Sequence, residues 1–129
     1  MPTEFRRHLA DSYGSDVFIT SVEGESALVY PLSVWEEVEA KLQKVPSSNR
    51  AKKRYLARVN YYGQQLRLDS QGRGVVPQIL REKAQIIGDV VVCGRLDHLE
   101  VWNREHFDQQ LQDDPLTDDD FETLSELGI

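Results

Sequence analysis

The chain has 129 residues, and 40% of them are hydrophobic, which is enough for one compact domain or for two small repeats with a shared core. No apolar run approaches the roughly 20 residues that cross a bilayer, and the first residues lack the apolar segment of a signal peptide. Cys93 is the only cysteine, which excludes an internal disulfide and a cysteine-based zinc cage. We therefore expect a cytoplasmic protein that does not associate with membranes.

The net charge of −7 comes from the acidic end of the chain. Residues 113–129 contain no Lys or Arg, so the first 112 residues hold 15 basic and 15 acidic side chains. A neutral body can still present a basic surface, and the total charge therefore does not exclude a nucleic-acid partner. The seven acids of this tail are Asp113, Asp114, Asp118, Asp119, Asp120, Glu122 and Glu126.

The first predicted elements are two strands and a helix. Residues 17–22 and 27–30 are rich in β-branched and aromatic side chains, and Gly24 lies in the turn between them. Ser33 and Glu36 have the spacing of a capping box, which predicts that Ser33 caps the helix. The apolar side of this helix consists of Val34, Trp35, Val38 and Leu42.

A second helix is predicted after the loop at residues 44–50. Its apolar positions recur at helical spacing and are Ala51, Tyr55, Val59 and Tyr62. The same segment holds the densest basic cluster of the chain. One interpretation is a phosphate-contacting surface with Arg50, Lys53 and Arg54 as contacts, and the other is a solvated helix face that pairs with a neighbour's acidic tail.

A turn with an arginine follows, between two apolar stretches. Arg73 comes after Gly72, and a guanidinium in such a turn can donate two parallel hydrogen bonds to guanine or bind a phosphate. Gly72 permits a positive φ, and Asp69 suits a cap of the turn. The alternative is that Asp69 and Arg73 are only a turn cap and a solvated charge. Pro77 then favours the start of a short helix that ends near Ala84.

The last predicted strands and helix repeat the plan of the first. Residues 90–93 and 98–102 are predicted strands, and the sequence Val29-Tyr30-Pro31 aligns with Val101-Trp102-Asn103 at an offset of 72 residues. The same offset aligns Trp35 with Phe107. Pro2–Arg6 also matches Pro77–Arg81, at an offset of 75. We expect Trp35, Trp102, Tyr61 and Tyr62 to serve packing rather than base stacking, and Cys93 to be a small buried hydrophobe.

The acidic tail has three interpretations. It can be a disordered, solubilising extension, or Phe121, Leu124 and Leu127 can dock on a partner subunit because they have helical spacing. It can also compete with DNA for a basic surface. Elsewhere the chain has no G-x-S-x-G, H-E-x-x-H, P-loop or dinucleotide-binding pattern, and His8, His98 and His106 have no metal-ligand spacing. We therefore predict no enzyme activity, no cofactor and no metal.

The segment "LDSQGRGVVPQILRE" resembles the D-x-K-G-R-x-x-x-P-x-x-x-R signature of the MraZ transcriptional regulators, which are related to the AbrB-type swapped-hairpin proteins. "LVYPLSVWEEVEAKL" and "LEVWNREHFDQQL" resemble the ends of the two MraZ repeats. The likeness extends over residues 2–111. The signature falls on Asp69, Gly72, Arg73, Pro77 and Arg81, with Gln71 in place of the family's lysine.

This resemblance implies an α+β fold in which two tandem ββαβ-type repeats form a small double-psi, swapped-hairpin β-barrel with flanking helices. The expected division is an N-terminally incomplete first repeat at 1–45, a linker helix at 46–64, a second repeat at 65–112 and the tail at 113–129. The resemblance also implies a ring-like homo-oligomer that binds double-stranded DNA at promoter repeats. It implies a nucleoid-associated repressor of the division and cell wall gene cluster.

Two departures from the family pattern leave an alternative open. Gln71 removes one phosphate-binding charge, and a first D-x-K-G-R signature is absent, so that either the true start lies upstream of Met1 or the chain is a divergent member. The alternative function is an oligomeric structural or interaction module with weakened or no DNA binding. For the regulator, Arg73, Gly72, Gln71, Asp69 and Arg81 are the predicted DNA-binding set.

Overall fold

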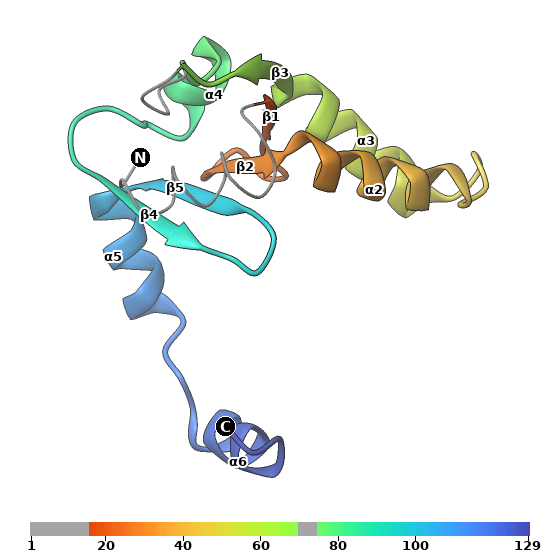
Figure 1. Ribbon diagram of the computed structural model, residues 1–129. Coiled ribbons are helices and arrows are strands. Elements are labelled where there is room, and N and C mark those ends of the chain that lie inside the picture. Colours follow the sequence, from red (N-terminus) through yellow and green to blue (C-terminus); the bar gives the residue numbers. More distant parts are fainter. Residues whose placement is uncertain (1–15, 70–74) are drawn as a thin grey trace.

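The computed structural model describes residues 16–69 and 75–129, which form one antiparallel sheet with helices around it (Figure 1). The strand order is β3-β1-β2-β5-β4, and every neighbouring pair is antiparallel. The sheet of the described residues is open, and it establishes a mixed α+β fold. Its strands are β1 (Asp16–Thr20), β2 (Ala27–Pro31), β3 (Gln64–Arg67), β4 (Val90–Gly94) and β5 (Leu99–Asn103).

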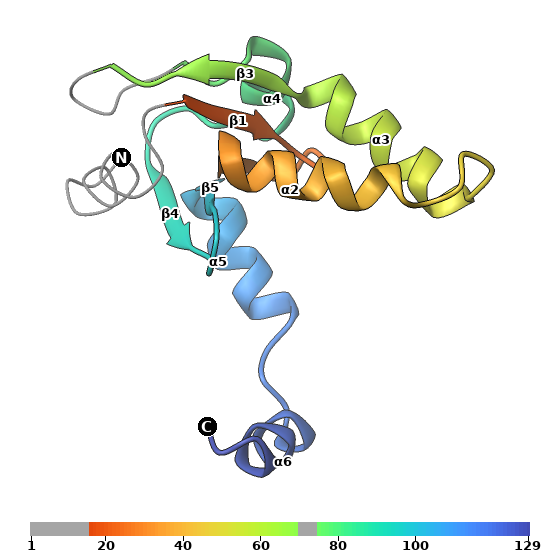
Figure 2. The ribbon, with the colours of Figure 1, turned by 45° about the vertical axis from the view of Figure 1, so that its right-hand side comes forward.

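Within the described residues, five helices accompany the sheet. The first two, α2 and α3, run side by side as a hairpin that projects from the sheet, and the last, α6, stands clear of it at the end of a short linker (Figure 2). None of the helices within the described parts of the chain is both long and apolar enough to cross a membrane. The helices are α2 (Leu32–Gln43), α3 (Arg50–Tyr62), α4 (Gln78–Lys83), α5 (Arg104–Asp113) and α6 (Asp118–Glu126).

The predicted internal likeness appears in the sheet as a local two-fold relation. Both ends of β2 and β5 differ by 72 residues, and so do the first residues of α2 and α5. In the central β2–β5 pair, Leu28 faces Glu100, its own counterpart at that offset, while Ala27 faces Val101 and Val29 faces Leu99. The pseudo-two-fold axis therefore passes between Leu28 and Glu100. The third strand, β3, pairs with β1 of the earlier segment, so the two segments interleave.

One face of the sheet carries the apolar core. Side chains alternate between the two faces of a strand, and the inward ones on β1 and β2 are buried together with Leu99 of β5. Helix α4 covers this face with Leu80, which is fully buried, and with Ala84. The core cluster consists of Val17, Ile19, Ala27, Val29, Leu68, Leu80, Ala84 and Leu99.

The opposite face is covered through aromatic contacts that repeat between the two segments. Trp35 of α2 lies against Tyr30, with ring centroids 5.2 Å apart, and Phe107 of α5 lies against Trp102 at 5.7 Å. These two pairs are related by the 72-residue offset. Trp35 also stacks on Phe18 at 4.6 Å. Both tryptophans are buried, which confirms the predicted packing role, whereas Tyr61 is exposed.

The start of α2 differs from the prediction. The helix begins at Leu32, its N-cap position is Pro31, and no side chain caps it, so the predicted Ser33–Glu36 capping box is wrong. Ser33 already lies inside the first turn, because β2 continues through Pro31 directly into the helix. At the equivalent position of the second segment, Asn103 does cap α5 by accepting a hydrogen bond from the His106 amide at 3.0 Å.

Two further expectations are corrected. The first strand ends at Thr20 and not at Val22, because the Ser21 hydroxyl accepts a hydrogen bond from the Gly24 amide at 2.9 Å and closes a turn. Cys93 is half-buried and not buried, since β4 is the end strand of the sheet that the described residues form. The predicted short helix after Pro77 and the helical stripe after the 44–50 loop are confirmed as α4 and α3.

Candidate nucleic-acid interface

The predicted DNA-reading turn connects β3 to α4, and the core fixes both of its stems. On one side Leu68 is buried, and on the other Val76 packs against the core and Leu80 is fully buried. Asp69, the first signature residue, is exposed directly after the β3 stem. Gln71, Gly72 and Arg73 lie outside the described residues. The positions of Leu68 and Val76 therefore fix the two points between which the turn is connected.

An ion pair at the end of β3 fastens this stem to β1. The Arg67 Nε donates to Asp16 Oδ1 at 3.0 Å and the second nitrogen donates to Oδ2 at 3.4 Å. The hydrogen bond from Arg67 lowers the pKa of Asp16 from its usual value. Residues 16 and 67 are partners in the strand register, which explains the contact. Sequence reasoning missed it, because nothing local in the sequence fixes a register between residues 51 positions apart.

Arg81, the last signature residue, lies in the last turn of α4 and is half-buried. Its backbone amide donates to the Pro77 carbonyl at 2.9 Å, and its carbonyl accepts from the Ile86 amide at 3.0 Å. The signature positions Pro77 and Arg81 are thus the two ends of one hydrogen-bonded helical turn. This turn sits immediately beyond the second stem.

The basic cluster lies on α3. The three predicted phosphate contacts Arg50, Lys53 and Arg54 are exposed. Arg58 Nη1 donates to the Arg54 carbonyl at 2.9 Å, so the row of arginines follows the helix surface. Lys52 differs from its neighbours, because its Nζ donates to the Val45 carbonyl at 2.9 Å and fastens the α2–α3 loop.

The structure separates the start of the basic cluster from the end of β3 within one copy. The chain runs along α3 and continues into β3, so the first residues of α3 and the end of β3 lie at opposite ends of this segment (Figure 2). Helix α3 alone extends roughly 20 Å, at about 1.5 Å per residue. A DNA duplex that contacted both the turn and the start of α3 would therefore do so in two separate regions.

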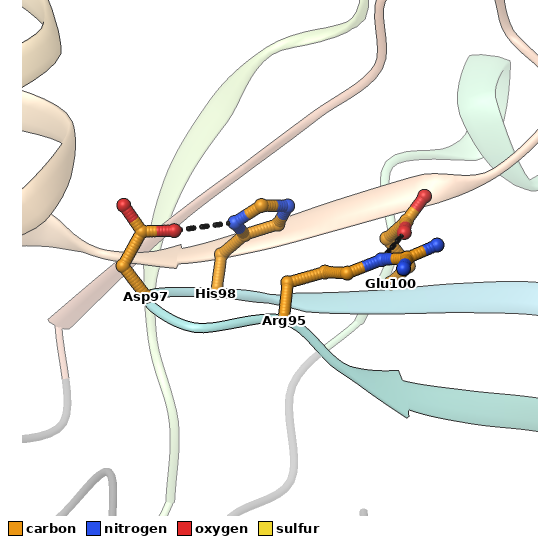
Figure 3. Close-up of polar contacts among 4 residues, drawn as sticks. All are labelled: Arg95, Asp97, His98 and Glu100. Atoms are coloured by element: carbon orange, nitrogen blue, oxygen red, sulfur yellow. Dashed lines mark hydrogen bonds and ion pairs between the residues drawn. The ribbon is translucent and has the colours of Figure 1, made fainter. Parts of the chain in front are cut away.

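A second polar cluster, which sequence reasoning missed, lies on the β4–β5 hairpin (Figure 3). Arg95 and Glu100 form an ion pair, and the Asp97 carboxylate contacts His98 Nδ1 at 2.7 Å. The His98 ring stacks on Tyr30 with centroids 4.4 Å apart. Burial, with a smaller effect of nearby negative charge, raises the pKa of Tyr30 to about 12. The charged side chains of the hairpin therefore pair with one another, and the Tyr30 hydroxyl stays protonated at neutral pH.

The described residues contain no group of three or more His, Cys, Asp or Glu side chains that could hold a metal ion. The arrangement favours a binding surface: a turn held by two core-anchored stems, and a helix with exposed cations.

Comparison with known proteins places this small α+β chain among bacterial transcriptional regulators. A family model described as "MraZ protein, putative antitoxin-like" matches residues 63–126, which include the turn. The chain is 50% identical over 129 residues to the Transcriptional regulator MraZ of Acidobacterium capsulatum, covering 100% of this chain and 88% of that protein. It is 42% identical over 130 residues to the regulator of the same name from Koribacter versatilis, with the same coverage.

A more distant relative agrees. The Transcriptional regulator MraZ of Chromobacterium violaceum is 34% identical over 113 residues, which are 88% of this chain and 76% of that protein. The chain therefore belongs to the MraZ family.

Proposed function

We propose that this protein is a sequence-specific DNA-binding transcriptional regulator that represses transcription. The observation that carries the proposal is the identity of 50% over the whole chain with a protein named Transcriptional regulator MraZ. The signature residues Asp69, Gly72 and Arg73 lie in the segment that the family model matches. The relatives are named regulators and not enzymes, in keeping with a binding role.

Arg73 reads the DNA in this proposal. Its guanidinium donates to O6 and N7 of guanine in the major groove, a pairing that distinguishes guanine from the other bases. Gly72 lets the backbone approach the duplex, Asp69 caps the turn, and Arg81 contributes charge from α4. Gln71 donates a neutral hydrogen bond where the family pattern has a lysine. The stems on both sides of this turn are held by the core through Leu68, Val76 and Leu80.

The exposed cations of α3 bind phosphate in this proposal. Arg50, Lys53 and Arg54 carry no base-reading geometry, and contacts to phosphate position a protein on DNA without specifying sequence. Since the start of α3 and the end of β3 lie at opposite ends of their segment, α3 contacts a different stretch of the duplex from the one that Arg73 reads. The affinity should fall steeply with salt, because each phosphate contact releases counterions.

In the assembly that we propose, several copies of the chain form a ring, and the two interleaved segments complete a swapped-hairpin barrel. The pairing of β3 with β1 and the pseudo-two-fold at Leu28 and Glu100 support interleaving. A ring arrays several turns on one DNA molecule, so weak single contacts add up to a strong one. Promoter repeats of the division and cell wall gene cluster are the proposed target, and the cytoplasm with its nucleoid the proposed location.

A fluorescence-anisotropy titration tests the function. The duplex comes from upstream of the protein's own gene, the control is a scrambled duplex of equal composition, and each is measured at two salt concentrations. The proposal predicts selective binding, and the logarithm of the binding constant should fall linearly with the logarithm of the salt concentration. Equal affinity for both duplexes would instead favour the alternative, an oligomeric interaction module, which the neutral Gln71 at the family's lysine position supports.

A further inference from the structure

The hairpin of α2 and α3 contains an apolar groove that the proposed DNA contacts do not use. The groove has a volume of about 510 Å³ and lies between the end of α2 and the beginning of α3. Val38, Leu42 and Val45 line one side and Tyr55 lines the other. These apolar side chains are half-buried, so they remain available to further packing.

The charged side chains that line this groove are basic, whereas Glu39 lines the adjoining hollow with Leu42 and Lys52. Lys41 and Lys52 are the charged residues that line the groove, and no acidic side chain does so. Arg54 and Arg58 extend the positive charge along α3, because each lies three residues beyond the lining positions Ala51 and Tyr55. An occupant of this groove should therefore combine apolar anchors with negative charge.

Helix α6 has this composition. Phe121 and Leu127 are 57% and 69% exposed, and Leu124 joins them on one side of the helix. Asp118 lies about 60° and Glu122 about 100° around the helix from Phe121, and Glu126 lies beside Glu122 one turn further on. The helix is formed without burying a residue, and a capping box of Thr117 and Asp120 supports its first turn. Its apolar side is therefore exposed to solvent and available to pack against a partner.

We propose that the acidic helix α6 of a second copy of this chain binds in the groove between α2 and α3. The short linker argues against the chain's own groove. Only residues 114–117 separate α6 from α5, a reach of about 14 Å at most, and α5 packs against β4 and β5. The α2–α3 hairpin contacts the sheet at β1 and β2 and projects away from α6 in both views (Figures 1 and 2).

A photo-cross-linking experiment tests this contact without DNA, so its result is independent of the proposed regulator function. The full chain carries p-benzoylphenylalanine in place of Phe121 and is irradiated at low salt. The inference predicts covalent dimers on a denaturing gel, with the cross-link mapped by mass spectrometry to the segment 38–55. Cross-links within single chains, cross-links to another segment, or no dimers would each overturn it.

Charge-reversal variants are the second part of the cross-linking experiment. Lys41→Glu should lower the dimer yield about threefold or more, since it replaces attraction by repulsion at an exposed position. Glu122→Lys in the same chain should restore much of the yield. Asp108→Lys is the matched control, because it makes the same charge change at an exposed position of α5 and should restore little of the yield. Equal restoration by Glu122→Lys and Asp108→Lys, or no effect of Lys41→Glu, would contradict docking in this groove.

Discussion

At the scale of single residues, two neighbouring side chains of α4 differ in whether they anchor the helix to the core. Leu80 is fully buried in the core beneath the sheet, whereas Ile79 is 40% exposed. The stem that follows the turn is therefore anchored through Leu80. This anchor fixes the position of the stem relative to the core.

Leu80→Ala should lower the free energy of unfolding by about 2–5 kcal/mol, because it removes buried methyl groups and leaves a cavity. Urea denaturation followed by circular dichroism measures this change. Ile79→Ala on the same helix is the matched control and should cost less than about 1 kcal/mol. If both variants lost the same stability, Leu80 would not occupy the core as described.

At the scale of elements, the junction between α3 and β3 determines where the first stem of the turn begins. The Thr20 hydroxyl of β1 donates to the Val59 carbonyl of α3 at 2.7 Å, and both groups are buried. Gly63, which ends α3, leaves no room for a side chain, since a Cβ there would collide with the Val59 carbonyl and the Phe18 ring. Glycine at this position lets α3 pass directly into β3 against β1.

Gly63→Ala should therefore destabilise the fold by about 1–3 kcal/mol through overpacking at the junction. Thermal and urea unfolding both report this loss. Asn60→Ala, on the exposed side of the same helical turn, should change stability by no more than about 0.5 kcal/mol. Stability of Gly63→Ala equal to that of the Asn60→Ala control would show that the junction tolerates a side chain.

Helix α6 should depend on pH through its capping box. The hydrogen bonds from Thr117, first from its backbone amide, lower the pKa of Asp120 from 3.8. A lowered folded-state pKa means that this stabilisation is present above the ordinary pKa and is lost as the pH falls through the lowered value. The ¹³Cα shifts of residues 118–126 should lose helical character over that range.

Asp120→Asn should flatten this pH dependence, because the titrating member of the capping box is gone. Asp119→Asn makes the same charge change in the same turn but lies outside the box, so its helix should still respond to acid. The capping account would fail if the two variants behaved alike.

The elements were largely predictable from the sequence, whereas the contacts between them were not. Runs of β-branched and aromatic residues predicted four of the five strands of the described sheet, and the 72-residue offset anticipated the relation between Tyr30–Trp35 and Trp102–Phe107. The bounds and the partner of β3 were not predicted, because its residues Gln64 to Arg67 carry no alternating pattern and gain their place only by pairing with β1. The Asp16–Arg67 pair and the hairpin cluster at His98 required the register as well.

At the scale of the whole molecule, the chain separates opposite charges into different regions. The exposed cations of α3 lie on the projecting hairpin, and seven acids lie in the segment 113–129. The chain therefore combines an acidic end with a basic surface on an otherwise neutral body, and the overall negative charge conceals that basic surface. Such a distribution suits both a DNA contact and a contact between copies, and salt should weaken both.

The central claim is that Arg73 reads DNA, and one comparison tests it directly. The affinity of Arg73→Ala for the upstream duplex is measured beside that of Arg104→Ala, which removes the same charge from the exposed first turn of α5. We predict that Arg73→Ala loses about 10- to 100-fold in affinity for this duplex and little for the scrambled one. Arg104→Ala should bind nearly as the unchanged protein does. Equal losses in the two variants, or a selective duplex affinity that survives Arg73→Ala, would contradict the account.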